Sequence, residues 1–437
     1  MDTVGGSGSE SSDRAGDAGR IHVSLSRRSL IVLAMIALAP WLFVGLAEIR
    51  QPAFLWSAEV GPATGRASAP RPAGGPASLH SRPGPWGDLE YIPITIAPPA
   101  EYMQELSPDM MGNPWHFPGM TVDQVKSFLD QLDLTAEQRS RLAARVATDP
   151  KTGGCVITPE ADVVQALSPD ARKWLYWLLG GSPLNLDQAN AFRIPCGDYE
   201  SRLSGLMLPP SVTNLVRHLS YGDDRYKFFA DLPLVLPLVP DPQDRVRLVR
   251  TLCEQSTMLI RLRVNEDSNI AALVEYWGRG GRTNEVTPLL ESLARVPGGE
   301  SVSVVGLLTG FPRGRMYTYM RPTMDEAVVA HDCHWTSLNF FNDRPDDRFL
   351  DKQIVRKVVA TEYHPIFANP ALGDLVLLVD RQRTVVHSAV YIADDIVLTK
   401  NGSRYSAPWM FARIDDVKAF YRCHEPVTVE YARRNDL

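Results

Sequence analysis

The chain has 437 residues, of which 44% are hydrophobic, 22% charged and 8% aromatic, and its formal net charge is −6. This composition is typical of a globular protein of two or three domains, so wholly disordered, collagen-like and coiled-coil classes are excluded. Because 51 acidic side chains outnumber 45 basic ones and no long basic run occurs, we expect no nucleic-acid partner. Five cysteines are too few for a disulfide scaffold, and at least one of them stays unpaired.

The N-terminal segment carries a candidate membrane anchor. Residues 1–28 are polar and rich in Gly, Ser and Asp, which predicts a disordered cytoplasmic tail. Residues 30–47 carry no charge and would extend ~27 Å as a helix, so we expect a transmembrane segment over 29–49. Arg27 and Arg28 precede it, and the positive-inside rule then places the rest of the chain outside the cytoplasm as a single-pass membrane protein. The same arginines fit a twin-arginine export signal, but no clear A-x-A cleavage site follows, which favours an uncleaved anchor.

Two segments of different character follow the anchor. Residues 50–118 are rich in Pro, Ala and Gly, which predicts an extended linker, and Trp86, Tyr91 and alternating isoleucines favour one short strand near its end. Residues 119–300 have apolar side chains at helical spacing behind Ser/Thr-Pro and capping-box starts, so we expect an all-helical domain.

Residues 301–437 show a mixed pattern. A helix is expected after about residue 315, followed by apolar, β-branched runs at 375–379, 384–392 and 396–400 that are separated by short turns. The fold class predicted for the whole chain is therefore α+β.

One cysteine and one histidine of this last segment form a candidate catalytic pair. Cys333 follows Asp332 at an expected helix start, where the helix dipole lowers the pKa of a thiol. His387 lies on an expected strand and would serve as base and then as proton donor to the leaving group. A thiolate of this kind predicts labelling of Cys333 by an iodoacetamide-type probe at pH 6.

The turn after the histidine strand decides which residue would orient the imidazole. A three-residue loop over 393–395 places Asn401 opposite His387, whereas a two-residue loop places Gly402 there and Lys400 on the same face. An amide acceptor suits an imidazolium better than a lysine does, which favours Asn401, although Asn-Gly is also an ordinary turn dipeptide.

These residues resemble a known family. The order Asp-Cys at a helix start, Gly373-Asp374 before a strand, and histidine on the next strand is similar to the NlpC-like and CHAP papain-fold peptidases, which cut peptide or amide bonds in bacterial cell wall. The resemblance covers about residues 315–437. It implies a papain-like domain over 301–437 that acts on cell-wall peptide without a cofactor, with Cys333 as nucleophile, His387 as base and Asn401 as the third polar residue.

The sequence departs from the pattern of this family at two positions. The third polar residue of such domains usually lies about twelve positions after the histidine, where this chain has Thr399. The cysteine of NlpC-like domains is usually followed by Ser or Gly, where this chain has His334.

Other interpretations of the same residues remain open. Cys333 could be an inert buried thiol and His387 a structural strand residue, which would make the chain a non-catalytic scaffold that binds an envelope protein. Acyl transfer to an acceptor other than water is a third possibility. His331, Cys333 and His334 match no zinc spacing, so no metal is expected. Cys155 and Cys196 could form a disulfide in an oxidising compartment.

Overall fold

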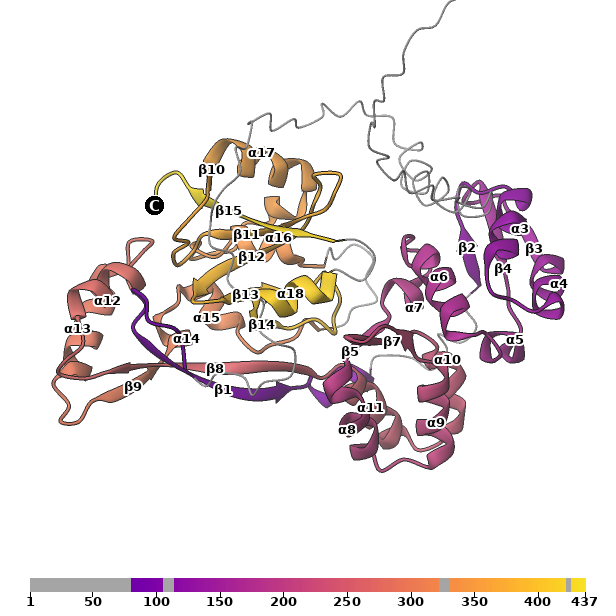
Figure 1. Cartoon of the computed structure of the whole chain (residues 1–437), viewed down its shortest axis with the longest axis horizontal. Coiled ribbons are helices and arrows are strands. Elements are labelled where there is room, and N and C mark those ends of the chain that lie inside the picture. The colour runs from indigo at the N-terminus through magenta and orange to yellow at the C-terminus, as the bar shows by residue number, and fades with distance from the viewer. Residues whose placement is uncertain (1–79, 105–113, 322–329, 422–425) are drawn as a thin grey trace, which may run out of the picture.

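The computed structural model describes residues 80–104, 114–321, 330–421 and 426–437 (Figure 1). The predicted tail, the predicted anchor and most of the predicted linker therefore lie outside the described residues. Within the described ranges, no helix has both the length and the apolar character needed to cross a bilayer. The α+β class is confirmed, because helices alternate with one six-stranded and three three-stranded sheets, all antiparallel.

The six-stranded sheet forms the centre of the C-terminal segment. Its strand order is β10-β15-β11-β12-β13-β14, and the three apolar runs predicted from the sequence are its strands β11 to β13. These strands are apolar throughout because both faces are covered: alternate residues of β11 enter two different cores, one beneath helices α16 and α17 and the other beneath α18. The elements are α16 (Cys333–Leu338), η2 (Asp347–Leu350), α17 (Lys352–Glu362), β10 (Tyr363–Ile366), β11 (Leu375–Val379), β12 (Val385–Ala393), β13 (Ile396–Lys400), β14 (Trp409–Arg413), α18 (Ile414–Tyr421) and β15 (Thr428–Arg434).

A long ribbon joins distant parts of the chain to this sheet. Strand β1 (Asp88–Ile96) pairs with β8 (Gln255–Val264) over nine positions, and β9 (Glu300–Ser303) pairs with the other edge of β8. One apolar core includes residues of β1, β8, β12 and β13. The end of the predicted linker is thus a strand of the folded body, and residues from β8 onward belong with the C-terminal sheet rather than with a separate helical domain. The helices of this part are α12 (Ile270–Trp277), α13 (Thr283–Ala294), α14 (Val304–Leu307) and α15 (Gly310–Arg315).

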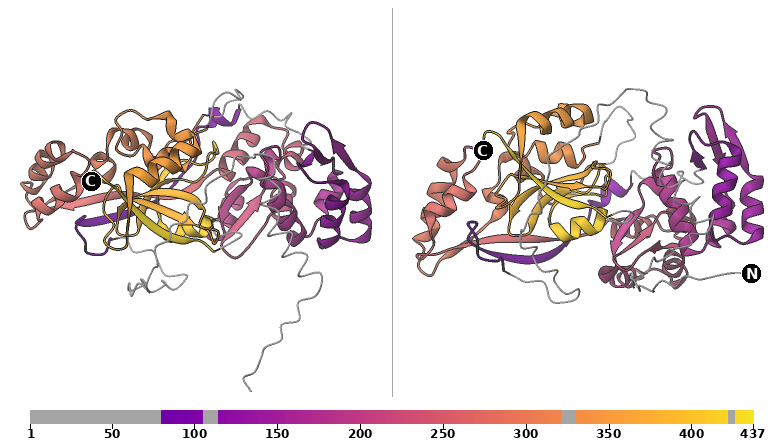
Figure 2. Two further views of the ribbon diagram at one scale, coloured as in Figure 1. Left: turned by 90° about the horizontal axis from the view of Figure 1, so that it is seen from above. Right: turned by 45° about the horizontal axis from the view of Figure 1, so that its top comes forward.

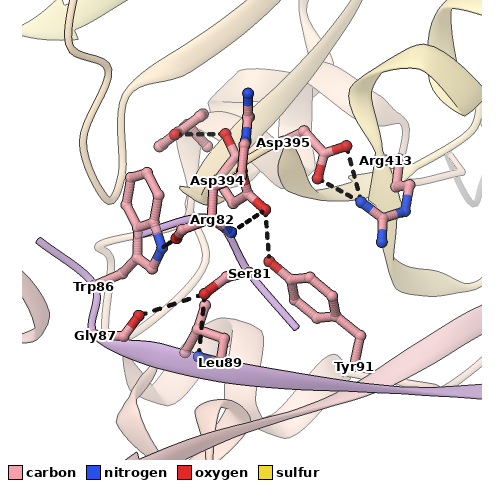
Figure 3. Close-up of polar contacts among 10 residues, drawn as sticks. Ser81, Arg82, Trp86, Gly87, Leu89, Tyr91, Asp394, Asp395 and Arg413 are labelled. Carbon is pink, nitrogen blue, oxygen red and sulfur yellow. Dashed lines mark hydrogen bonds and ion pairs between the residues drawn. The ribbon is translucent and has the colours of Figure 1, made fainter. Parts of the chain in front are cut away.

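Asp394, in the turn between β12 and β13, fastens the β1 segment to the sheet (Figure 3). Its carboxylate accepts hydrogen bonds from the Arg82 side chain and from the Tyr91 hydroxyl, the latter at 3.2 Å. The neighbouring Asp395 pairs with Arg413 at 2.7 Å. Burial, followed by the charge of Asp394, raises the pKa of Tyr91, so this phenol remains protonated as the donor.

Replacing Asp394 with asparagine is expected to loosen residues 80–96 while preserving the turn. Asparagine tolerates the positive φ of 55° at this position, but it removes the charge that Arg82 and Tyr91 contact. We expect a loss of about 1–3 kcal/mol in the free energy of unfolding and faster proteolytic cleavage before β1. Limited proteolysis with mass spectrometry measures this, and an unchanged cleavage rate before β1 would contradict the assigned contact.

Residues 114–252 fold around two further cores. The predicted all-helical domain is wrong, because two small sheets, β2-β4-β3 and β5-β7-β6, lie among the helices (Figure 2). Their strands are only two to four residues long, which is too short to show the alternation that predicts a strand. The elements before β8 are α2 (Ala100–Gln104), β2 (Trp115–Phe117), α3 (Val122–Gln131), α4 (Ala136–Ala144), β3 (Val146–Asp149), β4 (Gly154–Ile157), α5 (Ala161–Gln165), α6 (Pro169–Gly180), α7 (Leu186–Ala189), β5 (Phe192–Pro195), α8 (Cys196–Gly205), α9 (Pro210–Leu219), β6 (Tyr221–Gly222), β7 (Tyr226–Phe229), α10 (Leu232–Val235), η1 (Leu236–Leu238) and α11 (Pro242–Leu252).

The disulfide between Cys155 and Cys196 is not present. Both thiols are free: Cys155 is buried on β4, and the sulfur of Cys196 at the start of α8 lies 3.4 Å from the carbonyl oxygen of Asp223. Cys155 is part of a buried core, whereas Cys196 is only partly buried and belongs to none of the cores, so the helical pattern between them did not bring the two thiols together.

Candidate active site

Cys333 is the first residue of α16, as the sequence predicted. Asp332 caps the helix by accepting a hydrogen bond from the backbone N–H of Trp335 at 2.8 Å. The Trp335 ring stacks on His331, and its indole N–H donates to Asp347 at 3.0 Å. The contact with Asp347 holds the short helix against η2, and the helix also packs on β12 and β13. The Cys333 thiol is only 6% exposed and interacts with the backbone N–H of Ser388, the residue that follows His387. The predicted nucleophile therefore contacts the strand that carries the predicted base, at the residue next to His387.

His387 lies on β12, fully buried, and its ring nitrogens have different environments. Nε2 is 2.9 Å from the Thr399 hydroxyl, and this hydroxyl donates to Oδ1 of Asn401 at 3.0 Å. Because a hydroxyl has one hydrogen, and Thr399 gives it to Asn401, the imidazole must be the donor in its contact with Thr399. The proton of neutral His387 is therefore on Nε2, which leaves Nδ1 with its lone pair. Nδ1 is buried and has no hydrogen-bond partner among the described residues.

The predicted direct contact between Asn401 and His387 is wrong, and Thr399 stands between them. The register between β12 and β13 is the one that a three-residue loop produces, with Val390 opposite Leu398. In this register Thr399 lies diagonally across from His387 on the same face, within reach of the ring. Thr399 was not predicted as a site residue, and the twelve-residue spacing of the family pattern is the signal that could have found it.

Burial dominates the protonation of the cysteine and the histidine. It raises the pKa of Cys333 to about 12, and the charge of Asp332 adds to this effect. It also lowers the pKa of His387 well below the usual value, and the charge of His334 lowers it further. The expected low-pKa thiol is therefore wrong for this conformation: desolvation outweighs the field of a six-residue helix, and both groups are neutral.

One polar side chain of the neighbourhood, that of Lys400, was not predicted as part of the site. Lys400 is fully buried, donates to the carbonyl oxygens of Gly402 and Arg404 at 2.9 Å each, and lies 5.4 Å from the centre of the Trp409 ring. Burial lowers the pKa of Lys400 to about 7, although the electrostatic interactions with Cys333 and Asp332 act in the opposite direction. The sequence shows only a single lysine in an apolar strand, which does not indicate that its side chain is buried or that its pKa is lowered.

The histidine that departs from the family pattern joins helix to strand. Nδ1 of His334 is 2.8 Å from the hydroxyl of Ser388, which in turn lies 2.7 Å from the hydroxyl of Ser337. These contacts hold both ends of α16 against β12 at the residue next to His387.

Gly373 and Asp374 have a structural role. Gly373 adopts a φ of +90° in the turn before β11, where a Cβ atom would lie 2.1 Å from the Phe341 ring. The buried carboxylate of Asp374 accepts the backbone N–H of Ala371 and two N–H groups of Arg433, at 2.9 and 2.7 Å. The pair thereby fixes where β11 begins, and it does not touch the catalytic candidates.

Replacing Thr399 with valine is expected to release the tautomer of His387. Valine keeps the shape of threonine but accepts no hydrogen bond, so the Nε2–H loses its partner and the preference for this tautomer weakens. Nitrogen-15 shifts of the histidine ring report the tautomer directly. An identical spectrum for wild type and variant would contradict the hydrogen bond from His387 to Thr399.

No group of three or more His, Cys, Asp or Glu side chains gathers as metal ligands in the part of the chain that the structure describes. Comparisons with protein-family models, curated proteins and solved structures give no match. The chemistry of this site is therefore argued from its own geometry.

Proposed function

We propose that the protein is a cysteine hydrolase of the NlpC-like type that cleaves a peptide or amide bond. The observation that carries the proposal is the state of His387: its Nε2–H is held by Thr399, and its Nδ1 is an unpartnered base on the strand that Cys333 contacts. A papain-like hydrolase needs the imidazole in this tautomer.

The neutral groups define the order of proton transfers. As the sulfur of Cys333 forms a bond to the substrate carbonyl carbon, Nδ1 of His387 takes the thiol proton and the carbonyl oxygen becomes an oxyanion. The carbon–nitrogen bond then breaks, and Nδ1–H protonates the leaving amine, which produces a thioester. Water attacks the thioester, gives one proton to Nδ1, and the carbon–sulfur bond breaks as that proton returns to sulfur. Asn401 acts on this cycle through Thr399 and is a positioning residue.

Cell-wall peptide is the substrate class we propose. Two features of the sequence support it: the resemblance of residues 315–437 to cell-wall peptidases, and the predicted anchor that would place these residues outside the cytoplasm. The antiparallel sheet with a cysteine-bearing helix packed on its histidine strand is the arrangement that a papain-like domain would have.

A non-catalytic scaffold is the second candidate, and one observation favours it. The side chains of Cys333 and His387 are 6% and 0% exposed, so a substrate carbonyl reaches the sulfur only if the covering side chains move. Tyr421, which stacks on His387 with ring centres 4.3 Å apart, is one such side chain.

The test is hydrolysis of cell-wall muropeptides by the full-length chain, followed by mass spectrometry. We expect cleavage by wild type, no product with Cys333→Ala or His387→Ala, and a loss of roughly 10²-fold with Thr399→Val, in the range of one lost general-base contribution. Cys253→Ala is the matched control, because Cys253 is a buried cysteine on another core and should leave the rate unchanged.

Binding of muropeptides without cleavage would support the scaffold instead. Cleavage that survives Cys333→Ala would also overturn the proposal, since it would place the reaction at another group. A wild-type thioester adduct that hydroxylamine removes would assign the acyl intermediate to Cys333.

A further inference from the structure

One arginine of residues 114–252 contacts the helix that follows β14. Arg193 of β5 donates through Nη1 to the carbonyl oxygen of Phe420 at 3.3 Å, and its guanidinium carbon lies 4.4 Å from the centre of the Phe420 ring. Phe420 is in the last turn of α18, where backbone carbonyls have no partner within the helix and a positive charge is favourable. A residue 227 positions away along the chain therefore caps this helix.

The pairing of β5 with β7 builds the surface that receives Phe420. Arg193 lies opposite Phe228 in this ladder, and Tyr226, two residues before Phe228, lies on the same face. The Arg193 guanidinium is 5.5 Å from the centre of the Phe228 ring. The Tyr226 ring meets the Phe420 ring edge to face, with ring centres 5.9 Å apart. Arg193 thus contacts one aromatic ring from each of the two parts of the chain.

The residue after Phe420 covers the base of the candidate site. The Tyr421 ring stacks on the His387 imidazole with ring centres 4.3 Å apart and an interplanar angle of 24°. Tyr421 is half-buried, whereas His387 is 0% exposed, so the tyrosine ring shields one face of the imidazole. Displacing the last turn of α18 would expose that face.

Helix α18 buries little of itself against its own sheet. Of its eight residues only Val417 is buried, and Ile414 and Tyr421 pack partly against the core of that face. A helix of this length is not stable in water without tertiary contacts, so the contacts at its last turn decide whether that turn stays in place.

A second arginine joins the same two parts of the chain. Arg404, between β13 and β14, donates to two backbone carbonyl oxygens within residues 189–191. With Arg193 it lines a cavity of about 20 Å³, and Asn401, which positions His387 through Thr399, lines the same cavity. Residues 114–252 therefore reach the candidate site at two points, beside its cover and beside its positioning residue.

We propose that this contact is autoinhibitory: residues 114–252, through Arg193, hold the last turn of α18 so that Tyr421 closes the candidate site. Separating β5 from Phe420 releases this turn, the tyrosine ring leaves the imidazole, and the unpartnered Nδ1 of His387 becomes accessible. As control of hydrolysis, the inference rests on the proposed function, whereas the closure itself is a property of the fold.

The test is carbethoxylation of His387 by diethyl pyrocarbonate in the full chain, followed by peptide mass spectrometry, because the reagent acylates an unprotonated ring nitrogen that it can reach. We expect Arg193→Met and Phe420→Leu each to raise the rate at His387 roughly tenfold or more over wild type, since each removes one partner of the contact and favours local opening. Arg217→Gln is the matched control: Arg217 is an arginine of the same segment that pairs with Glu200, and its loss should leave the rate unchanged.

Two further measurements separate opening from unfolding and from catalysis. Tyr421→Ala removes the cover itself and should raise the rate at His387 at least as much. Alkylation of Cys253, which is 1% exposed in another core, reports general unfolding and should stay at the wild-type rate in every variant. Muropeptide hydrolysis should rise in Arg193→Met. Faster carbethoxylation without hydrolysis by any form of the chain would overturn the proposed hydrolase and still support the closure.

The inference is overturned if Arg193→Met keeps the wild-type rate at His387, or, where that variant does not fold, if Phe420→Leu keeps it. It is also overturned if alkylation of Cys253 rises together with carbethoxylation of His387, because the whole molecule has then loosened.

Discussion

Replacing Asp374 with alanine is expected to lower the free energy of unfolding of the C-terminal sheet by about 3–5 kcal/mol, the cost of breaking a buried ion pair from one side. The carboxylate is 0% exposed and holds Arg433 of β15 through two hydrogen bonds, and a second arginine, Arg279, lies 3.8 Å away. Removing the carboxylate leaves both guanidinium groups without a counter-charge and leaves the backbone N–H of Ala371 without its acceptor.

Urea denaturation followed by tryptophan fluorescence measures the effect, because Trp335 and Trp409 lie in the cores of this sheet. Asp343→Ala is the matched control: Asp343 is an exposed aspartate of the same segment, and its loss should change the free energy by less than about 0.5 kcal/mol. Equal midpoints for the two variants would show that Asp374 does not fix the start of β11.

The central strands were predictable because their evidence is local. Strands β11, β12 and β13 are continuous apolar, β-branched runs separated by short turns, so each could be bounded from its own residues. The helix start at Cys333 was predictable for the same reason, since Asp332 is a capping residue directly before it.

The pairing of β1 with β8 could not be predicted in the same way. Tyr91 lies opposite Ile260, and nothing in a proline-rich stretch indicates which distant strand will cover it. The Pro-rich composition of residues 50–118 describes the stretch as a whole, whereas the alternation inside 88–96 is a weaker signal within it. The domain boundary predicted at residue 300 was wrong for this reason. Strand β8 before it and strands β12 and β13 after it contribute to one apolar core, and neither segment alone indicates this.

The candidate site was predicted in its chain order but not in its contacts. A strand register decides which side chain meets His387, and a choice between Asn401 and Thr399 turns on one diagonal step across a ladder. The protonation of the pair depends on burial, which arises from packing between elements and leaves no trace in a short motif.

Alkylation of Cys333 in the native protein is expected to be about 10³-fold slower at pH 7 than alkylation of an ordinary thiol. The thiolate is the reacting form, and raising the pKa of the thiol from 9.0 to about 12 reduces its thiolate fraction a thousandfold. Below the pKa, the thiolate fraction rises tenfold with each pH unit, so the rate should rise tenfold between pH 7 and pH 8. Iodoacetamide labelling with mass spectrometry of the Cys333 peptide measures both values, and the same cysteine in urea is the reference.

The outcome separates two descriptions of the resting site. The slow, pH-proportional rate is that of a neutral thiol beside a neutral imidazole, which requires His387 to remove the proton as the sulfur attacks. Rapid labelling at pH 6 would instead show a thiolate–imidazolium pair formed in advance, and the field of the helix start would then exceed the cost of burying the charge. His387→Ala distinguishes these states once more: it should abolish rapid labelling if the ion pair exists, because the thiolate loses its counter-charge. If both groups are neutral, the labelling rate of Cys333 in His387→Ala should not fall below that of wild type, since an uncharged imidazole does not stabilise the thiolate.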